Sequence, residues 1–295
     1  MQLGIFAKTF PRRTFAETLD AVSSHGLHWV QFNFSCVGLP TLPQTIEPNV
    51  IAQVRNDCAG GTSSTSPTLT DRSGTHRVRP SIEIAAVSGT FNMIHPDVRS
   101  RRERLSRLPL LAKATHELGC DLITLCTGTR DPDDMWRAHS DNSSASAWRD
   151  LLQSMEEATA VAEQYNILLG VEPETGNVIS STRKARQLLD ELHSSRVKIV
   201  LDPANLFHHG KAERIRDTMQ EAFQLLGTNI VMAHAKEISA DGVTGNIVPG
   251  RGVLDWNYYF DMLAQMNFRG PMVMHGLAEA AVAEGVRFLR GKLWD

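Results

Sequence analysis

Hydrophobic residues in this chain are grouped into eight short runs rich in Val, Ile and Leu, and longer stretches with helical spacing separate most of them. Short apolar runs bounded by polar residues are typical of strands buried on both faces of a parallel sheet. The runs begin near residues 3, 29, 83, 121, 167, 198, 230 and 271. Eight strands alternating with helices predict an α/β fold of the (β/α)8 TIM barrel type, because eight strands close such a barrel.

The stretches between the runs carry apolar residues three and four positions apart, which predicts amphipathic helices. Asp97 is a suitable N-cap for a helix that continues to Leu118, where Gly119 would end it. The remaining helices are expected over residues 15–24, 148–165, 182–192, 214–226, 256–266 and 277–289. A doubly wound open sheet is the alternative fold, but no Gly-x-Gly-x-x-Gly motif follows an early strand.

Two polar segments interrupt this alternation of strands and helices. Residues 59–80 are rich in Gly, Ser, Thr and Arg without an apolar period, so we expect an irregular loop there, either mobile or acting as a lid. Residues 137–147 form a shorter polar loop after the fourth strand. No linker divides the 295 residues, which suit one barrel domain over 1–295 because such barrels typically need about 250 residues.

Three of the predicted strands end in a residue that binds metal ions well. Glu172 follows the fifth run, Asp202 follows the sixth, and His234 ends the seventh; the spacings are 30 and 32 residues. A strand, a crossover helix and the next parallel strand take about 30 residues, so these side chains recur once per unit. The carboxyl ends of barrel strands meet at one mouth. Two oxygen ligands and one nitrogen ligand suit a divalent ion such as Mn, Mg, Co or Zn.

Bulk composition excludes several other classes of protein. The net charge is −3 and the pI is about 6.4, so no overall positive field favours nucleic acid or an anionic membrane. No apolar run is long enough to span a membrane, and no signal peptide is recognisable at the start. Four cysteines without a C-x-x-C pair favour a reduced, cytoplasmic setting. A homo-oligomer is compatible with this composition.

The strand-end motifs resemble those of the xylose isomerase-like TIM barrels, a superfamily of sugar isomerases, epimerases and dehydratases that also includes a metal-dependent apurinic endonuclease. The resemblance extends from Leu3 to about Leu289, apart from the loop at 59–80. It rests on Val171-Glu172-Pro173, Leu201-Asp202-Pro203-Ala204-Asn205, His234-Ala235-Lys236-Glu237, Asn92-Met93-Ile94-His95-Pro96, and Pro249-Gly250-Arg251-Gly252 with Asp255-Trp256.

The resemblance implies that Glu172, Asp202 and His234 bind the metal directly. Members of the family usually supply a fourth ligand, a glutamate that ends the eighth strand. Here His275 occupies that position. Its imidazole can bind a metal ion, but it cannot act as the carboxylate base that the epimerases use there. Simple transfer of the epimerase mechanism is therefore not expected.

Side-chain alternation along a strand identifies candidate catalytic groups beside the ligands. Glu174 is expected on the same side as Glu172, and Lys236 on the same side as His234. Two neighbouring carboxylates can differ in pKa, so that one binds metal and the other transfers a proton. Glu172 and Glu174 are thus candidate bases, and Lys236 a candidate for stabilising an alkoxide. Loop capping or an ion pair is the structural alternative for each.

Three further polar residues are candidates for substrate binding. Asn205 can bind a substrate hydroxyl or cap the segment after Asp202. His95 can bind substrate or shuttle a proton, since its ordinary pKa lies near neutrality, or it can be a loop residue positioned by proline. Arg251, between two glycines, can bind a carboxylate or phosphate, although those glycines can simply shape a turn.

The leading hypothesis is a metal-dependent isomerase or epimerase of a sugar, sugar phosphate or polyol-derived ketone that works by proton transfer through an enediolate. A lyase or dehydratase acting on a keto-sugar at the same site is the alternative, because both reactions begin from the same enolate. An apurinic endonuclease-type phosphodiesterase is less favoured by the acidic balance. A sugar-binding barrel without turnover is the non-enzymatic alternative. In the leading case the partner is a small carbohydrate, with no nucleic acid and no membrane.

Overall fold

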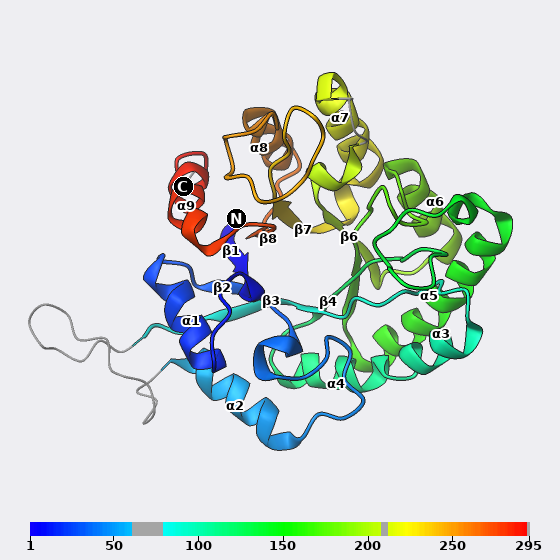
Figure 1. Ribbon diagram of the computed structural model, residues 1–295, viewed down its shortest axis with the longest axis horizontal. Coiled ribbons are helices and arrows are strands. Elements are labelled where there is room, and N and C mark those ends of the chain that lie inside the picture. Colours follow the sequence, from blue (N-terminus) through cyan, green and yellow to red (C-terminus); the bar gives the residue numbers. More distant parts are fainter. Residues whose placement is uncertain (61–78, 208–211, 294–295) are drawn as a thin grey trace, which may run out of the picture.

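The computed structural model describes residues 1–60, 79–207 and 212–293. As predicted, it contains a closed barrel of eight parallel strands in sequence order, completed by pairing of the last strand with the first. Figure 1 shows the strands at the centre and the helices around them. The strands are β1 Gln2–Phe6, β2 Trp29–Phe32, β3 Glu83–Ser88, β4 Leu122–Leu125, β5 Leu168–Val171, β6 Val197–Leu201, β7 Ile230–Ala235 and β8 Pro271–Met274.

The helices of the outer ring follow the predicted amphipathic stretches closely. Two of them, α1 and α6, have the predicted bounds. They are α1 Phe15–Ser24, α2 Pro48–Ala59, α3 Val98–Leu105, α4 Leu108–Glu117, α5 Ala145–Tyr165, α6 Thr182–Leu192, α7 Ile215–Leu226, α8 Trp256–Gln265 and α9 Val282–Arg290. Thr14 and Glu17 form a reciprocal capping box at the start of α1, which satisfies backbone N–H groups that the helix leaves unpaired.

The prediction of one helix from Asp97 to Leu118 was wrong. Asp97 does cap a helix, since its side chain accepts a hydrogen bond from the backbone N–H of Arg99, but that helix ends at Leu105. A second helix, α4, begins at Leu108, with Pro109 in its first turn. Proline has no N–H to donate and is tolerated only at a helix start, so the chain restarts there.

The ends of two other predicted helices also shift. Helix α5 begins at Ala145 rather than Trp148, because the side-chain oxygen of Ser144 accepts an N-cap hydrogen bond from the N–H of Ala147. Helix α9 begins at Val282 rather than Leu277, after a single 3-10 turn over Glu279–Ala281. Both differences lie at helix boundaries, which the apolar period alone does not determine.

A buried tyrosine joins the outer ring to the strand ends that carry the candidate ligands. The hydroxyl group of Tyr259, on α8, contacts the carbonyl oxygens of Leu201 and His234, each at 3.3 Å. Tyr259 is fully buried, and burial raises the pKa of its hydroxyl well above the ordinary value, so the group stays protonated. Helix α8 is therefore fastened to the ends of β6 and β7, where Asp202 and His234 lie.

The predicted irregular segment at 59–80 falls mainly on residues outside those that the structure describes. Of this segment, Ala59 ends α2, and residues 60, 79 and 80 are also described. Among the described residues, none of the helices combines the length and the apolar character that a membrane span requires.

Candidate metal centre and active-site cavity

The three ligands predicted from strand spacing come together at the carboxyl ends of β5, β6 and β7. The Nδ1 atom of His234 lies 3.2 Å from Glu172 Oε1 and 3.7 Å from Asp202 Oδ2. Asp202 and His234 are fully buried, and Glu172 is nearly so. The three side chains meet because each lies at the carboxyl end of its strand, and these ends surround one mouth of the barrel.

Electrostatic coupling within this group shifts each pKa. Burial alone would raise the pKa of Glu172, but neighbouring His234 outweighs burial and lowers it. The same balance, with Lys236 and His234 outweighing burial, lowers the pKa of Asp202 to about 2. Burial would lower the pKa of His234, yet Glu172 and Asp202 raise it to about 9. Both carboxyl groups are therefore ionised at neutral pH, as metal ligands must be.

His275 completes the cluster at the end of β8. Its ring stacks on the ring of His234, with centroids 5.0 Å apart and an interplanar angle of 6°, and on its other side it stacks on Phe6 at 5.4 Å. Burial, followed by the nearby charge of His234, lowers the pKa of His275 to about 4. A neutral imidazole with a free lone pair is the form that binds a metal ion.

The group of side chains fits a divalent ion. Atoms of Asp202, His234 and His275 that can bind metal lie within 4.8 Å of one another. Among the described residues, Asp202 Oδ2 and His275 Nδ1 are buried without a hydrogen-bond partner. Leaving a buried charged oxygen unsatisfied is costly, and a bound cation would remove that cost. Glu172 adds a carboxylate oxygen from beside His234.

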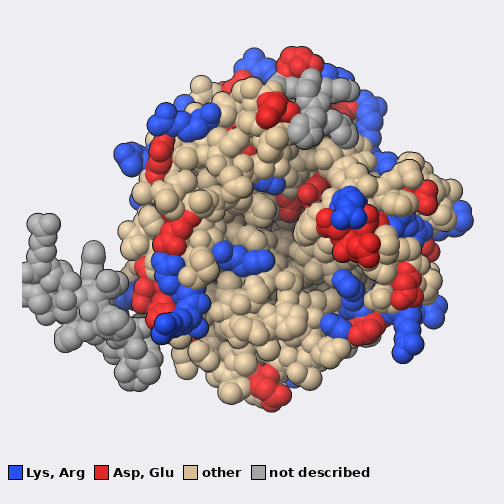
Figure 2. Space-filling view, viewed as in Figure 1, with Lys and Arg blue, Asp and Glu red and all other residues tan. Residues whose placement is uncertain are grey.

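A cavity of about 430 Å³ opens over this cluster. Its lining includes five residues expected at the site, namely Glu172, Glu174, Asn205, Lys236 and His275. Figure 2 shows a hollow near the centre of this view of the molecule, with acidic and basic side chains both at its edge. Such a volume suits a small molecule.

Lys236 and Asn205 form a hydrogen-bonded chain that ends at the candidate ligand Glu172. Lys236 Nζ donates to Asn205 Oδ1 at 2.6 Å, and Asn205 Nδ2 donates to Glu172 Oε1 at 2.6 Å. Lys236 Nζ also lies 3.9 Å from Asp202 Oδ2. Asn205 therefore orients Glu172, and Lys236 presents a positive charge to the cavity beside the cluster.

Glu174 lies apart from this chain, on the cavity wall. It is more exposed than Glu172. Burial, followed by the charge of Glu172, raises the pKa of Glu174 to about 7. The two carboxyl groups thus differ in pKa in the direction expected when one binds metal and the other exchanges protons.

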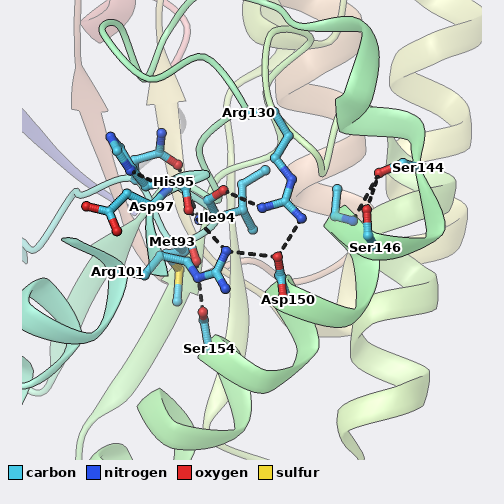
Figure 3. Close-up of polar contacts among 12 residues, drawn as sticks. Met93, Ile94, His95, Asp97, Arg101, Arg130, Ser144, Ser146, Asp150 and Ser154 are labelled. Atoms are coloured by element: carbon cyan, nitrogen blue, oxygen red, sulfur yellow. Dashed lines mark hydrogen bonds and ion pairs between the residues drawn. The ribbon is translucent and has the colours of Figure 1, made fainter. Parts of the chain in front are cut away.

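His95 does not line this cavity. Its Nε2 contacts the carbonyl oxygen of Pro132 at 3.0 Å, and its Nδ1 accepts a hydrogen bond from the N–H of Asp97 at 3.1 Å. Figure 3 shows the neighbouring segment fastened to α5, where the guanidinium groups of Arg101 and Arg130 both reach Asp150. Arg101, one of a run of arginines, is thus part of a partly buried ion-pair cluster that holds the loop after β3.

Arg251 also lies outside the cavity lining, and its exposed guanidinium pairs with Glu284 at 2.6 Å. The glycines on either side of Arg251 lie close to the carboxylate of Glu237, and the N–H of Gly250 donates a hydrogen bond to it. A Cβ at Gly252 would lie 2.6 Å from the side chain of Glu237, so only glycine lets the loop pass this close. The motif after β7 is therefore a cradle for Glu237.

Glu237 supports a stability prediction, because its buried carboxylate accepts four hydrogen bonds. These come from the N–H groups of Ile238, Gly250 and Leu254 and from Trp256 Nε1, at 2.7–3.0 Å. Glu237→Gln would turn an amide NH₂ toward donors, so we expect a loss of about 2–4 kcal/mol in the free energy of unfolding.

The measurement is urea unfolding, and the matched control is Glu284→Gln, which removes an exposed carboxylate from an ion pair and should cost less than about 1 kcal/mol. Equal urea midpoints for the two variants would show that the hydrogen bonds to Glu237 do not stabilise the fold.

Several residues of the cavity were not identified from the sequence. They are Phe6, Lys8, Gln31, Asn33, Thr41, Ser88, Thr90, Met135 and Trp136. Gln31 had a recognisable signal, since it is a polar residue in the otherwise apolar strand β2, and Ser88 is a polar residue that ends the apolar run of β3. Trp136 had none, because it comes from a polar loop whose path the spacing of residues does not predict.

A second cavity, of about 510 Å³, lies at the opposite end of the barrel, where Trp29, Glu83 and Pro271 begin their strands. Residues at this end of TIM barrels generally serve stability, and active sites form at the other mouth. We therefore assign the candidate site to the cavity over the ligand cluster.

Fold and site together define this chain as a (β/α)8 barrel with a candidate metal centre at the carboxyl ends of its strands. The chain belongs to the xylose isomerase-like TIM barrel family, whose model matches residues 19–292. The match covers every strand except β1.

Individual proteins are similar to the chain either over part of its length or at low sequence identity. The D-psicose 3-epimerase of Enterocloster bolteae is 29% identical over 126 residues, which cover 42% of this chain but only 38% of that relative. A D-psicose 3-epimerase solved with D-tagatose, from Clostridium cellulolyticum H10, superimposes with a TM-score of 0.70 at 15% identity, covering 99% of this chain and 98% of its own. The IOLI protein with a binding zinc atom gives 0.67 at 14% identity, covering 99% and 96%.

Proposed function

We propose that this protein is a metal-dependent isomerase or epimerase that transfers a proton at the carbon beside the carbonyl group of a sugar. The proposal rests on one observation: Glu174 and Lys236 line a single cavity beside the cluster of Glu172, Asp202, His234 and His275. Relatives that act as sugar epimerases support the class of substrate.

Glu172, Asp202, His234 and His275 would hold the ion. Mn, Mg, Co and Zn are the candidates, and the similarity to a zinc-binding barrel supports zinc. When bound, such an ion would chelate neighbouring substrate oxygens and acidify the C–H bond between them.

Glu174 is the group that we assign to proton transfer. Glu172 is held by Asn205 and His234, whereas Glu174 lines the cavity and has a raised pKa. A carboxylate at this place can remove the proton and return it to the neighbouring carbon, which is the work of an isomerase. Lys236 Nζ stabilises the enediolate oxygen that develops, because a preorganised positive charge favours the charged state over the neutral substrate.

The identity of the β8 residue bears on the choice between reactions. An epimerase that protonates the opposite face of the same carbon needs a second proton-transfer group. His275 is stacked between Phe6 and His234 with its Nδ1 buried, so we do not assign proton transfer to it. That task would fall to Lys236. Elimination of water from the same enediolate, which makes a lyase, requires no second face.

The test is elemental analysis of the purified protein, followed by incubation of the Mn-loaded enzyme with keto-sugars and inososes in deuterated water. We expect incorporation of one solvent deuterium beside the carbonyl group of at least one substrate, abolished by removing the metal with a chelator. Recovered isomer or epimer indicates the proposed reaction, and loss of water from the labelled product indicates the lyase. Sugar binding without exchange across the panel would contradict both.

A further inference from the structure

Gln31, on β2, contacts the candidate ligand His234 from the side of the ring that faces away from the carboxylates. Gln31 Oε1 lies 3.1 Å from His234 Nε2. Both residues are buried, with Gln31 only 4% exposed. They are joined across the barrel interior rather than through neighbouring strands, since β2 pairs with β1 and β3 and β7 with β6 and β8.

Two hydroxyl groups fix the amide of Gln31 in one orientation. Its Nε2 donates to Ser88 Oγ and to Thr124 Oγ1, both at 3.1 Å, and these residues are also buried. The pairing of β2 with β3 shifts by one residue between Val30 and Gln31, and such bulges commonly re-aim side chains beside active sites. With its two N–H groups used, the amide presents its carbonyl oxygen to His234.

The direction of this hydrogen bond determines which imidazole nitrogen keeps its proton when a metal ion takes the other. A carbonyl oxygen can only accept, so His234 Nε2 must donate and must keep its hydrogen. The other nitrogen, Nδ1, is the one that faces Glu172 Oε1 and Asp202 Oδ2. A metal ion needs the lone pair of that nitrogen, and only the tautomer with the proton on Nε2 provides it.

We propose that Gln31 is a positioning residue that fixes the ring orientation and the tautomer of His234, so that Nδ1 is available to a divalent ion. The proposal rests on the metal site proposed above. A partner that accepts from the second N–H of a metal-bound histidine also makes the ring a stronger ligand. Glutamine does this without adding a negative charge to a site that already holds Glu172, Asp202 and Glu174.

The test compares Gln31→Met, which removes the acceptor at similar length, with Gln31→Glu, which keeps an acceptor. Zn²⁺ alone is titrated into metal-free protein in competition with a chromogenic chelator. We expect Gln31→Met to weaken Zn²⁺ binding by about 10- to 100-fold, since partners of this kind contribute that much to affinity. Gln31→Glu should bind at least as tightly as the unaltered protein.

The matched control is Gln44→Met, the same substitution at an exposed glutamine far from the cluster, which should leave the Zn²⁺ affinity unchanged. Far-UV circular dichroism identifies any variant that does not fold. A second readout is the ¹⁵N spectrum of histidine-labelled, Zn-loaded protein, with the His234 signals identified by their loss in His234→Asn. We expect a protonated Nε2 and a metal-bound Nδ1.

Gln31 also lines the cavity, so direct substrate binding is the competing explanation. That role would raise KM in Gln31→Met and leave Zn²⁺ affinity unaltered, which would overturn the proposal. A metal-bound Nε2, or equal weakening in the Met and Glu variants, would overturn it as well. Failure of the unaltered protein to bind Zn²⁺ would instead overturn the metal site itself.

Discussion

Asp202→Asn is expected to abolish stoichiometric binding of a divalent ion while the barrel remains folded. Asp202 is fully buried, and its Oδ2 has no hydrogen-bond partner among the described residues although it faces His234 and Lys236. Its Oδ1 accepts from the N–H of Ala204 at 3.0 Å, a bond that an asparagine oxygen can keep. The substitution therefore removes a negatively charged ligand and leaves the local turn in place.

We expect the affinity for Zn²⁺ or Mn²⁺ to fall by more than about a hundredfold, because even a hydrogen-bond partner of a ligand contributes 10- to 100-fold. Elemental analysis after dialysis gives the occupancy, and circular dichroism gives the fold. The matched control is Asp121→Asn, an exposed carboxylate just before β4, at the opposite end of the barrel, which should retain full occupancy. Full occupancy in Asp202→Asn as well would show that the cluster is not the metal site.

The sequence was sufficient to predict the barrel, for a physical reason. Buried parallel strands need apolar residues on both faces, so each strand appears as a short apolar run such as 199–201 between amphipathic helices. Eight such runs are enough to close a barrel. The same regularity predicted that Glu172, Asp202 and His234 share a mouth, because each lies at the carboxyl end of its strand. The wrong predictions concerned single helices, as at Pro109, where the chain forms two helices instead of the one predicted.

Residues on loops were harder to assign than residues on strands. His95 and Arg251 follow strands in sequence, as the ligands do, but their loops turn them toward Pro132 and Glu284. Trp136 shows the converse, since its polar loop returns to the cavity wall. Strand geometry fixes where a side chain points, whereas a loop's path depends on contacts distant in sequence, such as those of Arg101 and Arg130 with Asp150.

The three carboxylates of the site differ in the groups that stabilise their charged form. Glu172 accepts a hydrogen bond from Asn205 and lies beside His234, and Asp202 lies between His234 and Lys236, so both are stabilised as anions. Glu174 has neither the asparagine nor the histidine contact and lies on the cavity wall. A base must reach substrate, and we therefore propose Glu174, which lines the cavity, as the base.

Glu174→Gln is therefore expected to lower turnover by about 10²- to 10⁴-fold, the usual contribution of a positioned acid–base group, while metal occupancy stays full. Glutamine matches the shape of glutamate but cannot accept the substrate proton. The measurements are kcat on whichever sugar exchanges deuterium, the rate of that exchange, and metal content. Glu172→Gln is the informative comparison, because it should lose metal as well as turnover. If Glu174→Gln keeps exchange while Glu172→Gln abolishes it at full metal occupancy, Glu172 is the base and our assignment of the two carboxylates is reversed.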